Sequence, residues 1–444
     1  MTLNLLMRNN SGLNLWQKAI KVIPGGNGLL SKRPDRYAPD IWPTYFDSAH
    51  GVNVVDLDGQ SYIDMAQMGL GSAILGYANP ELTESVSRAI HKGVNCTLNA
   101  PEEVELAEKL LELNPFAGGV RFARSGGEAM AIAVRIARAH TGRSKVAFSG
   151  YHGWCDWYLA TNLPGGDKLS AHLLPGLSTK GVPAGLEGTA VPFLYNDLSD
   201  CERVLRENED LGVICIEGAR YDFPSQDFLN LIFDIARRKN IVVIFDEITS
   251  GWRMTNGGVY KLNNSDPDIV VYGKAMGGGF AMAAIVGKSK VMDAAQDTFM
   301  SSTMWTERVG FVAALKTIEI LTRDRVWEHL IMIGCAIEEG WKLLAQKHNL
   351  LIDVTDFKPL ITMKFKYGNR NPAIITLFTQ EMLRRGYLAA ISVYVSQSHT
   401  LEIVTNYLEA VDEVFLLLSN AIKSSSELKF LETKPKSDSF QRLT

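Results

Sequence analysis

Two charged residues, Asp246 and Lys274, each stand at the end of a short apolar, β-branched run. Asp246 closes the run 242–246, and Lys274 follows the run 269–272 after one glycine. Runs this apolar predict strands that are buried on both faces of a parallel sheet. In open α/β folds the carboxyl ends of such strands carry the ligand sites. A carboxylate and an amine at the ends of neighbouring strands are therefore candidates for chemistry on a bound ligand.

This pair has two interpretations. Charged residues are rarely buried unless paired, so the first is a buried ion pair. The glycines favour a second, because Gly273 and the run 277–279 leave room beside the lysine and let the backbone approach a ligand. In the second interpretation Lys274 forms a Schiff base with pyridoxal 5'-phosphate (PLP), and Asp246 is the partner of the pyridinium nitrogen. A ring kept protonated by the carboxylate draws electrons from the carbon being deprotonated.

Both motifs resemble those of a known enzyme family. The segments 245–248 (Phe-Asp-Glu-Ile) and 272–276 (Tyr-Gly-Lys-Ala-Met), with the motifs below, are similar to the class III aminotransferases of PLP fold type I. Within that family the chain looks like the glutamate-1-semialdehyde aminomutases and their aminotransferase-like cousins. The resemblance runs from about Leu15 to about Phe415. It implies a PLP-dependent enzyme with Lys274 as its Schiff-base residue.

A turn of small residues precedes one predicted helix. Ser125, Gly126 and Gly127 stand directly before a helical pattern that continues over 130–140. The exposed N–H groups of a helix start, with the helix dipole, form a cradle for an anion. A generic glycine-rich helix start is the alternative, but beside the carboxylate–lysine pair we interpret it as a cup for the PLP phosphate. The family usually carries a hydroxyl residue where Gly127 stands, so one phosphate hydrogen bond is missing.

The resemblance also assigns groups around the cofactor ring. It puts Tyr151 on one face of the pyridine ring and Ile248 on the other, which fixes the substrate bond that stands perpendicular to the ring. His152 is interpreted either as a cofactor contact or as structural packing. Glu217 closes another apolar run. It is expected either near the phenolic edge of the cofactor or in a structural pair with Arg220.

Thr303 matches a family threonine that reaches across a dimer interface to the phosphate of the partner's PLP. The resemblance therefore implies a homodimer with a shared active site. The run that follows, 304–308 (Met-Trp-Thr-Glu-Arg), departs from the Leu-Ser-Gly-Asn-Pro usual in the family. This departure alters a pocket wall, so the family's substrate is not carried over to this chain.

The elements that must position these residues alternate along the chain. Strand and helix patterns alternate across residues 60–320, which predicts an α/β fold with a doubly wound, mainly parallel sheet. The resemblance adds a small α+β domain built from both terminal segments. We expect residues 1–75 to form the N-terminal part of the small domain and residues 76–322 to form the large PLP-binding domain. Residues 323–423 are expected to form the C-terminal part of the small domain, and residues 424–444 a flexible tail.

Composition limits the functional classes. The chain has 444 residues, of which 46% are hydrophobic and 21% charged, and its net charge of −4 argues against nucleic acid as the main partner. Its cysteines are dispersed without paired metal spacing, so we expect reduced thiols, a cytoplasmic location and no metal site; they are Cys96, Cys155, Cys201, Cys215 and Cys335. No apolar stretch approaches the length of a membrane span, and residues 1–8 lack the pattern of a cleaved leader. We therefore expect no membrane partner.

The expected reaction is amino-group transfer from an amino-acid donor to a carbonyl acceptor. The loop 29–34 and the run 306–308 are similar to relatives of surface-polysaccharide and amino-sugar pathways, which suggests a keto or aldehyde sugar or another polar small acceptor. An intramolecular 2,1-aminomutase is the first alternative. It needs a gating loop, however, and the segment 292–300 is helical in character and short. A non-catalytic PLP-fold binding protein is the second alternative.

Overall fold

The computed structural model describes residues 10–440 and 442, which form two compact units. One unit joins the described residues up to Asn79 with those from His329 onward, and the other runs from Pro80 to Glu328. The exact domain boundaries expected from the sequence stay a prediction. Residues 1–9, 441, 443 and 444, which include the N-terminal segment considered above, lie outside the described residues.

The Pro80–Glu328 unit is built on a seven-stranded sheet with the order β4-β10-β9-β8-β7-β5-β6. The pairs from β9 through β8, β7 and β5 to β6 are parallel, whereas β10 runs antiparallel to both β9 and β4. The predicted mainly parallel sheet is therefore confirmed. Its strands are β4 (Gly119–Ala123), β5 (Lys145–Ser149), β6 (Ala190–Pro192), β7 (Leu211–Glu217), β8 (Val242–Asp246), β9 (Ile269–Tyr272) and β10 (Ala283–Gly287).

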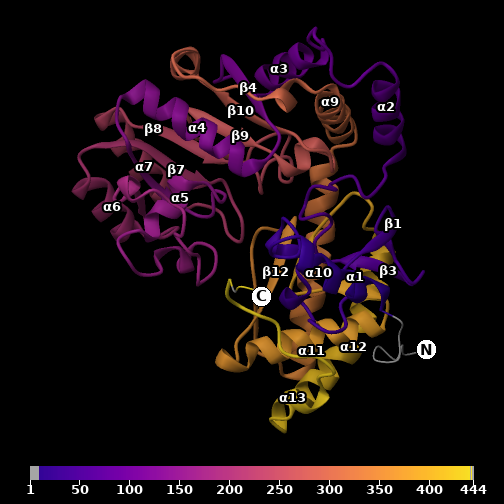
Figure 1. Ribbon diagram of the computed structural model, residues 1–444. Helices are drawn as coiled ribbons and strands as arrows, with labels where there is room; N and C mark the ends of the chain where they lie inside the picture. The colour runs from indigo at the N-terminus through magenta and orange to yellow at the C-terminus, as the bar shows by residue number, and fades with distance from the viewer. Residues whose placement is uncertain (1–9, 441, 443–444) are drawn as a thin grey trace. The chain divides into compact units, whose positions relative to one another are not determined.

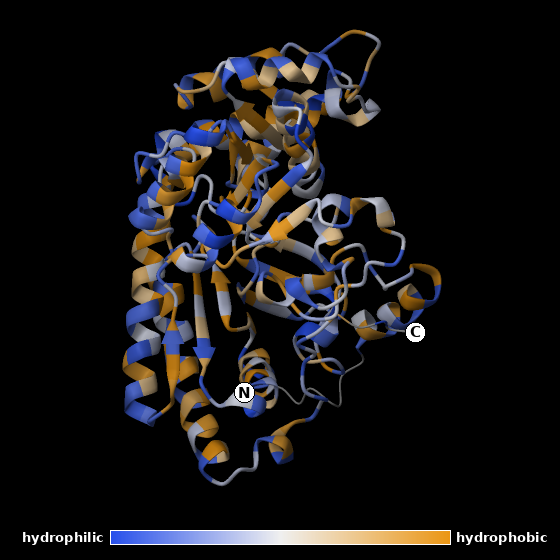
Figure 2. Cartoon of the chain, turned by 90° about the vertical axis from the view of Figure 1, so that its left-hand side faces the viewer, coloured by the Kyte–Doolittle hydropathy of each residue, from blue (hydrophilic) through white to orange (hydrophobic). Residues whose placement is uncertain are grey.

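The central strands are apolar because both faces of the sheet are covered. Every residue of β7, β8 and β9 is buried, including the charged residues that close β7 and β8. Figure 2 shows these strands in the colours of hydrophobic residues, while the helices carry both hydrophobic and hydrophilic residues. Continuous burial explains why the strands show an unbroken apolar pattern rather than an alternating one.

Helices pack on this sheet. The helix α4 lies across it (Figure 1), and its buried face joins the core that the strands form. The helices of this unit are α2 (Pro80–His91), α3 (Glu102–Leu113), α4 (Gly126–Thr141), α5 (Asp156–Leu159), α6 (Leu198–Glu207), α7 (Gln226–Lys239), α8 (Ser289–Met292) and α9 (Arg308–Arg323), and α10 (Val326–His348) begins in it. Most follow a strand, as expected for a doubly wound sheet.

The other unit is a mixture of helices and two smaller sheets. A four-stranded sheet has the order β1-β2-β3-β13, and a three-stranded sheet has the order β11-β12-β14. Their strands are β1 (Phe46–His50), β2 (Asn53–Asp56), β3 (Ser61–Met65), β11 (Ile352–Val354), β12 (Leu360–Phe365), β13 (Tyr387–Ala389) and β14 (Ser392–Tyr394). The unit's further helices are α1 (Ser11–Val22), α11 (Asn371–Arg384), α12 (Leu401–Lys423) and α13 (Glu427–Phe430).

The two chain ends meet in this unit. Strand β13 pairs parallel with β3, so residues far apart in sequence share one sheet. The segment after α12 forms α13, and beyond it the Thr433 hydroxyl accepts a hydrogen bond from the Asp40 amide at 3.0 Å. The amide of Ser437 donates to the Asp35 carbonyl at 2.7 Å. Flexibility of this tail stays a prediction. Within residues 10–440 and 442, none of the helices is long and apolar enough to cross a membrane.

Candidate active site

All the catalytic and cofactor-binding residues predicted from the sequence belong to the Pro80–Glu328 unit, and nearly all follow the carboxyl ends of its parallel strands. Asp246 and Glu217 close the neighbouring strands β8 and β7, where they stand opposite each other in register. Lys274 comes two residues after β9. Ser125, Gly126 and Gly127 follow β4, whereas Tyr151 and His152 follow β5. The topology thus brings five separate sequence segments to one edge of the sheet.

Asp246 is a buried carboxylate, only 4% exposed, that is held from two sides. Its Oδ2 lies 2.8 Å from Nδ1 of His152, and its Oδ1 accepts a hydrogen bond from the amide of Ile248 at 3.0 Å. The other ring nitrogen of His152, Nε2, lies 3.2 Å from the carbonyl oxygen of Ser149. Both ring nitrogens of His152 therefore face oxygen atoms that can accept a hydrogen bond. His152 thus supports the carboxylate directly.

Lys274 has an unusual backbone conformation and a lowered side-chain pKa. Its φ is +41°, a left-handed conformation that costs a residue with a Cβ about 1–3 kcal/mol and recurs at functional sites. Its Nζ donates a hydrogen bond to the Thr249 hydroxyl at 2.8 Å. Burial lowers the pKa of Lys274 to about 8, and the charges of Arg220 and Arg253 act in the same direction. An amine with this pKa is roughly one-fifth neutral near pH 7.4, whereas an ordinary lysine, with a pKa of about 10.4, is almost wholly protonated.

The turn after β4 has hydrogen-bond donors that suit a phosphate. Ser125 is the N-cap of the 16-residue helix α4, yet its side chain makes no capping hydrogen bond. A Cβ at Gly126 would come within 2.9 Å of the Ile248 side chain, and a Cβ at Gly127 within 3.0 Å of Trp154. The glycines thus let Ile248 and Trp154 approach the helix start. Backbone N–H groups, the helix dipole and the Ser125 hydroxyl together fit an anionic phosphate.

The turn after β5 is fixed against β7. The amide of Tyr151 donates to Oε2 of Glu217 at 3.2 Å. Gly150 has φ +113°, and a Cβ there would lie 2.5 Å from the same carboxylate oxygen. Burial raises the pKa of Glu217, and Arg220, whose Nη1 lies 3.5 Å from Oε1, acts against that rise. The two alternatives for Glu217 are therefore compatible, because it pairs with Arg220 and also contacts the turn that carries Tyr151.

The sequence assigned no role to Arg124 and Glu128, but both hold the loop after Thr303. The Arg124 guanidinium donates to the carbonyl oxygens of Met304 at 2.6 Å, Trp305 at 3.1 Å and Glu307 at 2.6 Å. Glu128 accepts from the Trp305 indole at 2.9 Å and from the Arg124 amide at 2.8 Å. We call these contacts the clasp. In the sequence, only two features indicated the clasp. One is the charged residue directly before the small-residue turn, and the other is the acid in the first turn of the helix.

Thr303 itself is exposed in the structure of the single chain. It begins the short 3₁₀ helix η9 (Thr303–Thr306). After it, Glu307 caps α9 by accepting a hydrogen bond from the amide of Gly310 at 3.2 Å. The clasp and this cap hold the run 304–308, which departs from the family pattern, in a defined place next to the phosphate cup.

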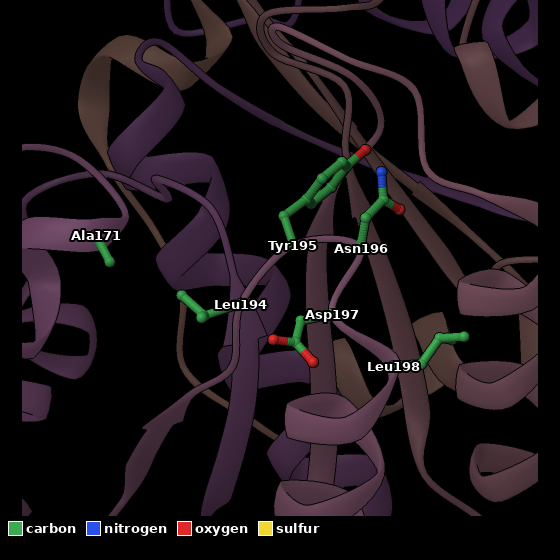
Figure 3. Close-up of a pocket in the computed structure, with 6 residues that line it drawn as sticks. All are labelled: Ala171, Leu194, Tyr195, Asn196, Asp197 and Leu198. Carbon is green, nitrogen blue, oxygen red and sulfur yellow. The ribbon is translucent and has the colours of Figure 1, made fainter.

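An open hollow of about 610 Å³ lies at the segment between β6 and α6. It is lined by Ala171, Leu194, Tyr195, Asn196, Asp197 and Leu198 (Figure 3). The Tyr195 hydroxyl donates to the Glu217 carbonyl at 3.3 Å, and the Asn196 amide group donates to the Phe223 carbonyl at 2.9 Å. The Asp197 carboxylate caps α6. These polar groups serve the backbone, and no site residue predicted from the sequence lines the hollow.

Comparison with known proteins agrees with this geometry. The family described as "Aminotransferase class-III" matches residues 37–409. A 3-aminobutyryl-CoA aminotransferase of Cloacimonas acidaminovorans is 32% identical over 414 residues, covering 90% of this chain and 95% of that protein. A glutamate-1-semialdehyde 2,1-aminomutase of Methanothermobacter thermautotrophicus is 31% identical over 428 residues, covering 91% and 99%.

Solved structures share the fold. An omega-transaminase from Sphaerobacter thermophilus superimposes with a TM-score of 0.82 at 25% identity, covering 94% of this chain and 99% of that one. The FumI protein of Sphingopyxis sp. MTA144, solved with PLP, gives a TM-score of 0.84 at 24% identity, covering 96% and 98%; at this identity it shows the fold alone. The fold is thus PLP fold type I. By sequence and by fold, the chain is a PLP-dependent enzyme and belongs to the class III aminotransferase family.

Proposed function

We propose that this chain transfers an amino group from an amino-acid donor to a carbonyl acceptor, with PLP bound at Lys274. The observation that carries the proposal is the pair of Lys274 and Asp246 at the ends of β9 and β8. The lysine has a pKa of about 8, while the carboxylate is buried beside His152. A neutral amine and a fixed negative charge on one edge are the two groups that such a transfer requires.

PLP, when bound, supplies the carbonyl that captures an amine and the ring that accepts electrons from the carbon losing its proton. Lys274 is the residue proposed to hold the cofactor covalently and, once displaced by the donor, to move the proton between the substrate carbon and the cofactor carbon. Its lowered pKa suits both tasks, because a neutral amine attacks a carbonyl and accepts a proton. The Thr249 hydroxyl, 2.8 Å away, keeps Nζ in place.

Asp246 is proposed to hold the ring nitrogen in its protonated form. His152 and the Ile248 amide contact the two carboxylate oxygens and hold them in place although the side chain is buried. Ile248 and Tyr151 are proposed to press on the two faces of the ring, since both lie at this edge of the sheet. Confinement of the ring orients the substrate bond that breaks and excludes water from it.

The phosphate site is proposed to be shared between two copies of the chain. Ser125 and the amides of Gly126 and Gly127 supply donors at the start of α4. The phosphate carries close to two negative charges, and Gly127 offers no hydroxyl. Thr303 is exposed in the single chain and suited to supply a further hydroxyl to the partner's cofactor. We propose a homodimer for this reason.

For the acceptor, we propose a polar small carbonyl compound, such as a keto or aldehyde sugar. The support for it is the run 304–308, which departs from the family pattern, together with the similarity of this run and of the loop 29–34 to relatives of amino-sugar pathways.

A 2,1-aminomutase is the second candidate, favoured by the 31% identity with the aminomutase of Methanothermobacter thermautotrophicus. A mutase must retain its intermediate behind a gating loop. In this chain the segment 292–300 is short; it contains the last residue of α8 and the short 3₁₀ helix η8 (Asp293–Gln296), followed by four residues outside any helix, and its shortness supports a transferase. Consumption of an external amino donor separates the two, because a mutase needs none.

The direct test is transfer of a labelled amino group. The PLP-loaded protein is given ¹⁵N-labelled amino acids and a panel of carbonyl acceptors, and mass spectrometry follows the label. We expect label in an acceptor, and we expect none with Lys274→Ala, because the attachment point is gone. Borohydride reduction and peptide mapping should place the cofactor on Lys274. Attachment to Lys288 or Lys290, or no transfer from any donor, would contradict the proposal.

The Asp246→Asn variant should bind PLP but turn over about 10⁴-fold more slowly. The amide keeps the shape of the carboxylate and loses its charge, and a comparable exchange in a catalytic triad has an effect of about that size. An absorbance titration measures the cofactor affinity, and single-turnover kinetics measure the rate. Near-normal turnover would rule out the proposed role of the carboxylate.

The reaction of cofactor-free protein with PLP should report the pKa of Lys274. Only the neutral amine attacks the cofactor carbonyl, so the rate should rise with pH up to about 8 and then level off. An ordinary lysine, with a pKa of about 10.4, would give a rate that keeps rising beyond pH 9. Stopped-flow absorbance between pH 6 and pH 10 distinguishes the two profiles, with Lys274→Ala as the blank.

Thr303→Ala should weaken PLP binding by about 10- to 100-fold, the value of one hydrogen bond to a charged group. Sharing of the site is tested by mixing this variant with Lys274→Ala at limiting PLP. If Thr303 acts on the partner's cofactor, a mixed dimer has one intact site, and activity returns. If each site uses its own Thr303, both sites of the mixed dimer stay damaged. A catalytically competent monomer in sedimentation would also end the proposal.

A further inference from the structure

Arg220 places a positive charge at the same sheet edge as Lys274. It stands three residues after Glu217, which closes β7. Its guanidinium carbon lies 5.8 Å from the centre of the Tyr151 ring and 5.5 Å from that of Tyr221. Tyr151 is the ring proposed to cover one face of the cofactor. Arg220 therefore lies beside the space in which a substrate bound to that cofactor has to fit.

Solvent reaches this arginine. The Arg220 side chain is 24% exposed, compared with 9% for Glu217, its carboxylate neighbour. Arg253, the other arginine whose charge lowers the pKa of Lys274, is fully buried at 0% exposure. Of these two arginines near the reactive lysine, Arg220 is thus the one that a solute can contact.

The ion pair between Arg220 and Glu217 is loose. The distance from Nη1 to Oε1 is 3.5 Å, whereas charge-assisted hydrogen bonds between such groups span about 2.7–2.9 Å. The other Glu217 oxygen already accepts a hydrogen bond from the Tyr151 amide, and burial opposes the negative charge of Glu217. A guanidinium presents a planar fork of donors that matches a carboxylate with two parallel hydrogen bonds. A substrate carboxylate that reaches the exposed part of this side chain can offer the two oxygens that such a fork matches.

We propose that Arg220 binds a carboxylate of the substrate, and that it selects amino acids and keto acids over amines that lack an acid group. The inference rests on the proposed function and deepens it by naming the residue that recognises the acid group of the donor. Arg220 is then a residue that determines specificity, stacked on Tyr151 and oriented by Glu217.

Single-turnover kinetics without any acceptor test this proposal. The PLP-loaded protein is mixed with L-alanine and 4-aminobutanoate and with their decarboxylated counterparts, ethylamine and propylamine, and the cofactor absorbance reports amino-group uptake. In Arg220→Gln, uptake from the better carboxylated donor should fall about 10- to 100-fold, the effect of a hydrogen bond to a charged group. Uptake from its decarboxylated counterpart should change less than about threefold by the same reasoning. Equal losses with both donors would mean a purely structural role, and an unchanged preference would also overturn the proposal.

Two further variants control for charge and for folding. Arg220→Lys keeps the charge without the fork, so it should retain part of the preference. Arg237→Gln makes the same change at an arginine with similar contacts. The Nη2 atom of Arg237 lies 2.6 Å from Oδ2 of Asp266, and its guanidinium carbon lies 5.6 Å from the centre of the Phe233 ring. This control should leave the donor preference unchanged. Unaltered PLP affinity in Arg220→Gln shows that the site remains intact.

Calorimetry with unreactive acids separates this inference from the proposed function. Propionate and butanoate carry the carboxylate without the amine, so at least one should bind the PLP-loaded protein and bind Arg220→Gln about 10- to 100-fold more weakly. If no donor reacts but this loss is seen, the proposed function fails and the carboxylate site stands. Equal affinity in both proteins overturns the site. Tighter, Arg220-dependent binding of inorganic phosphate would overturn the carboxylate as its ligand.

Discussion

The site depends on one buried negative charge. Asp246 ends a strand that is buried throughout, and an ionised carboxylate in that position is stable only with partners. His152 and the Ile248 amide supply them at 2.8 Å and 3.0 Å. Because His152 belongs to the turn after β5, the need to pair Asp246 fixes that turn above the end of β8. The same turn carries Tyr151, so one electrostatic requirement positions both Asp246, the proposed partner of the ring nitrogen, and Tyr151, the proposed cover of one ring face.

Close backbone approach is the second constraint. Gly153 has φ +103°, and a Cβ there would lie 2.7 Å from the Cα of Gly127, so the turn after β5 and the phosphate cup touch through glycines. Ile248 contacts the cup at Gly126 and lies near Gly273, which precedes the lysine. The strained backbone of Lys274 persists because its surroundings are packed in this way. Cup, carboxylate and lysine are therefore one packed unit rather than three independent motifs.

The clasp extends this unit toward the proposed second subunit. Arg124 lies next to the phosphate cup and holds the carbonyl groups of Met304, Trp305 and Glu307. The loop that it holds begins at Thr303, the residue proposed to serve the partner's cofactor. The N–H donors of Arg124 thus connect two segments that are distant in sequence, the turn before α4 and the loop that begins at Thr303.

The sequence alone predicted the sheet, because burial on both faces leaves unbroken apolar runs. It also singled out Lys274 and Asp246, because a charged residue at the end of such a run is unusual, and the resemblance of their motifs indicated the family. It did not determine that β10 runs antiparallel, since an apolar strand has the same composition in either direction. Nor could it choose between the two interpretations of His152 or of Glu217. Those depend on which carboxylate or amide each side chain meets across strands β5, β7 and β8. Arg124, Glu128 and Thr249 acquired roles only in the tertiary structure, because hydrogen bonds between distant segments leave no periodic pattern in the chain.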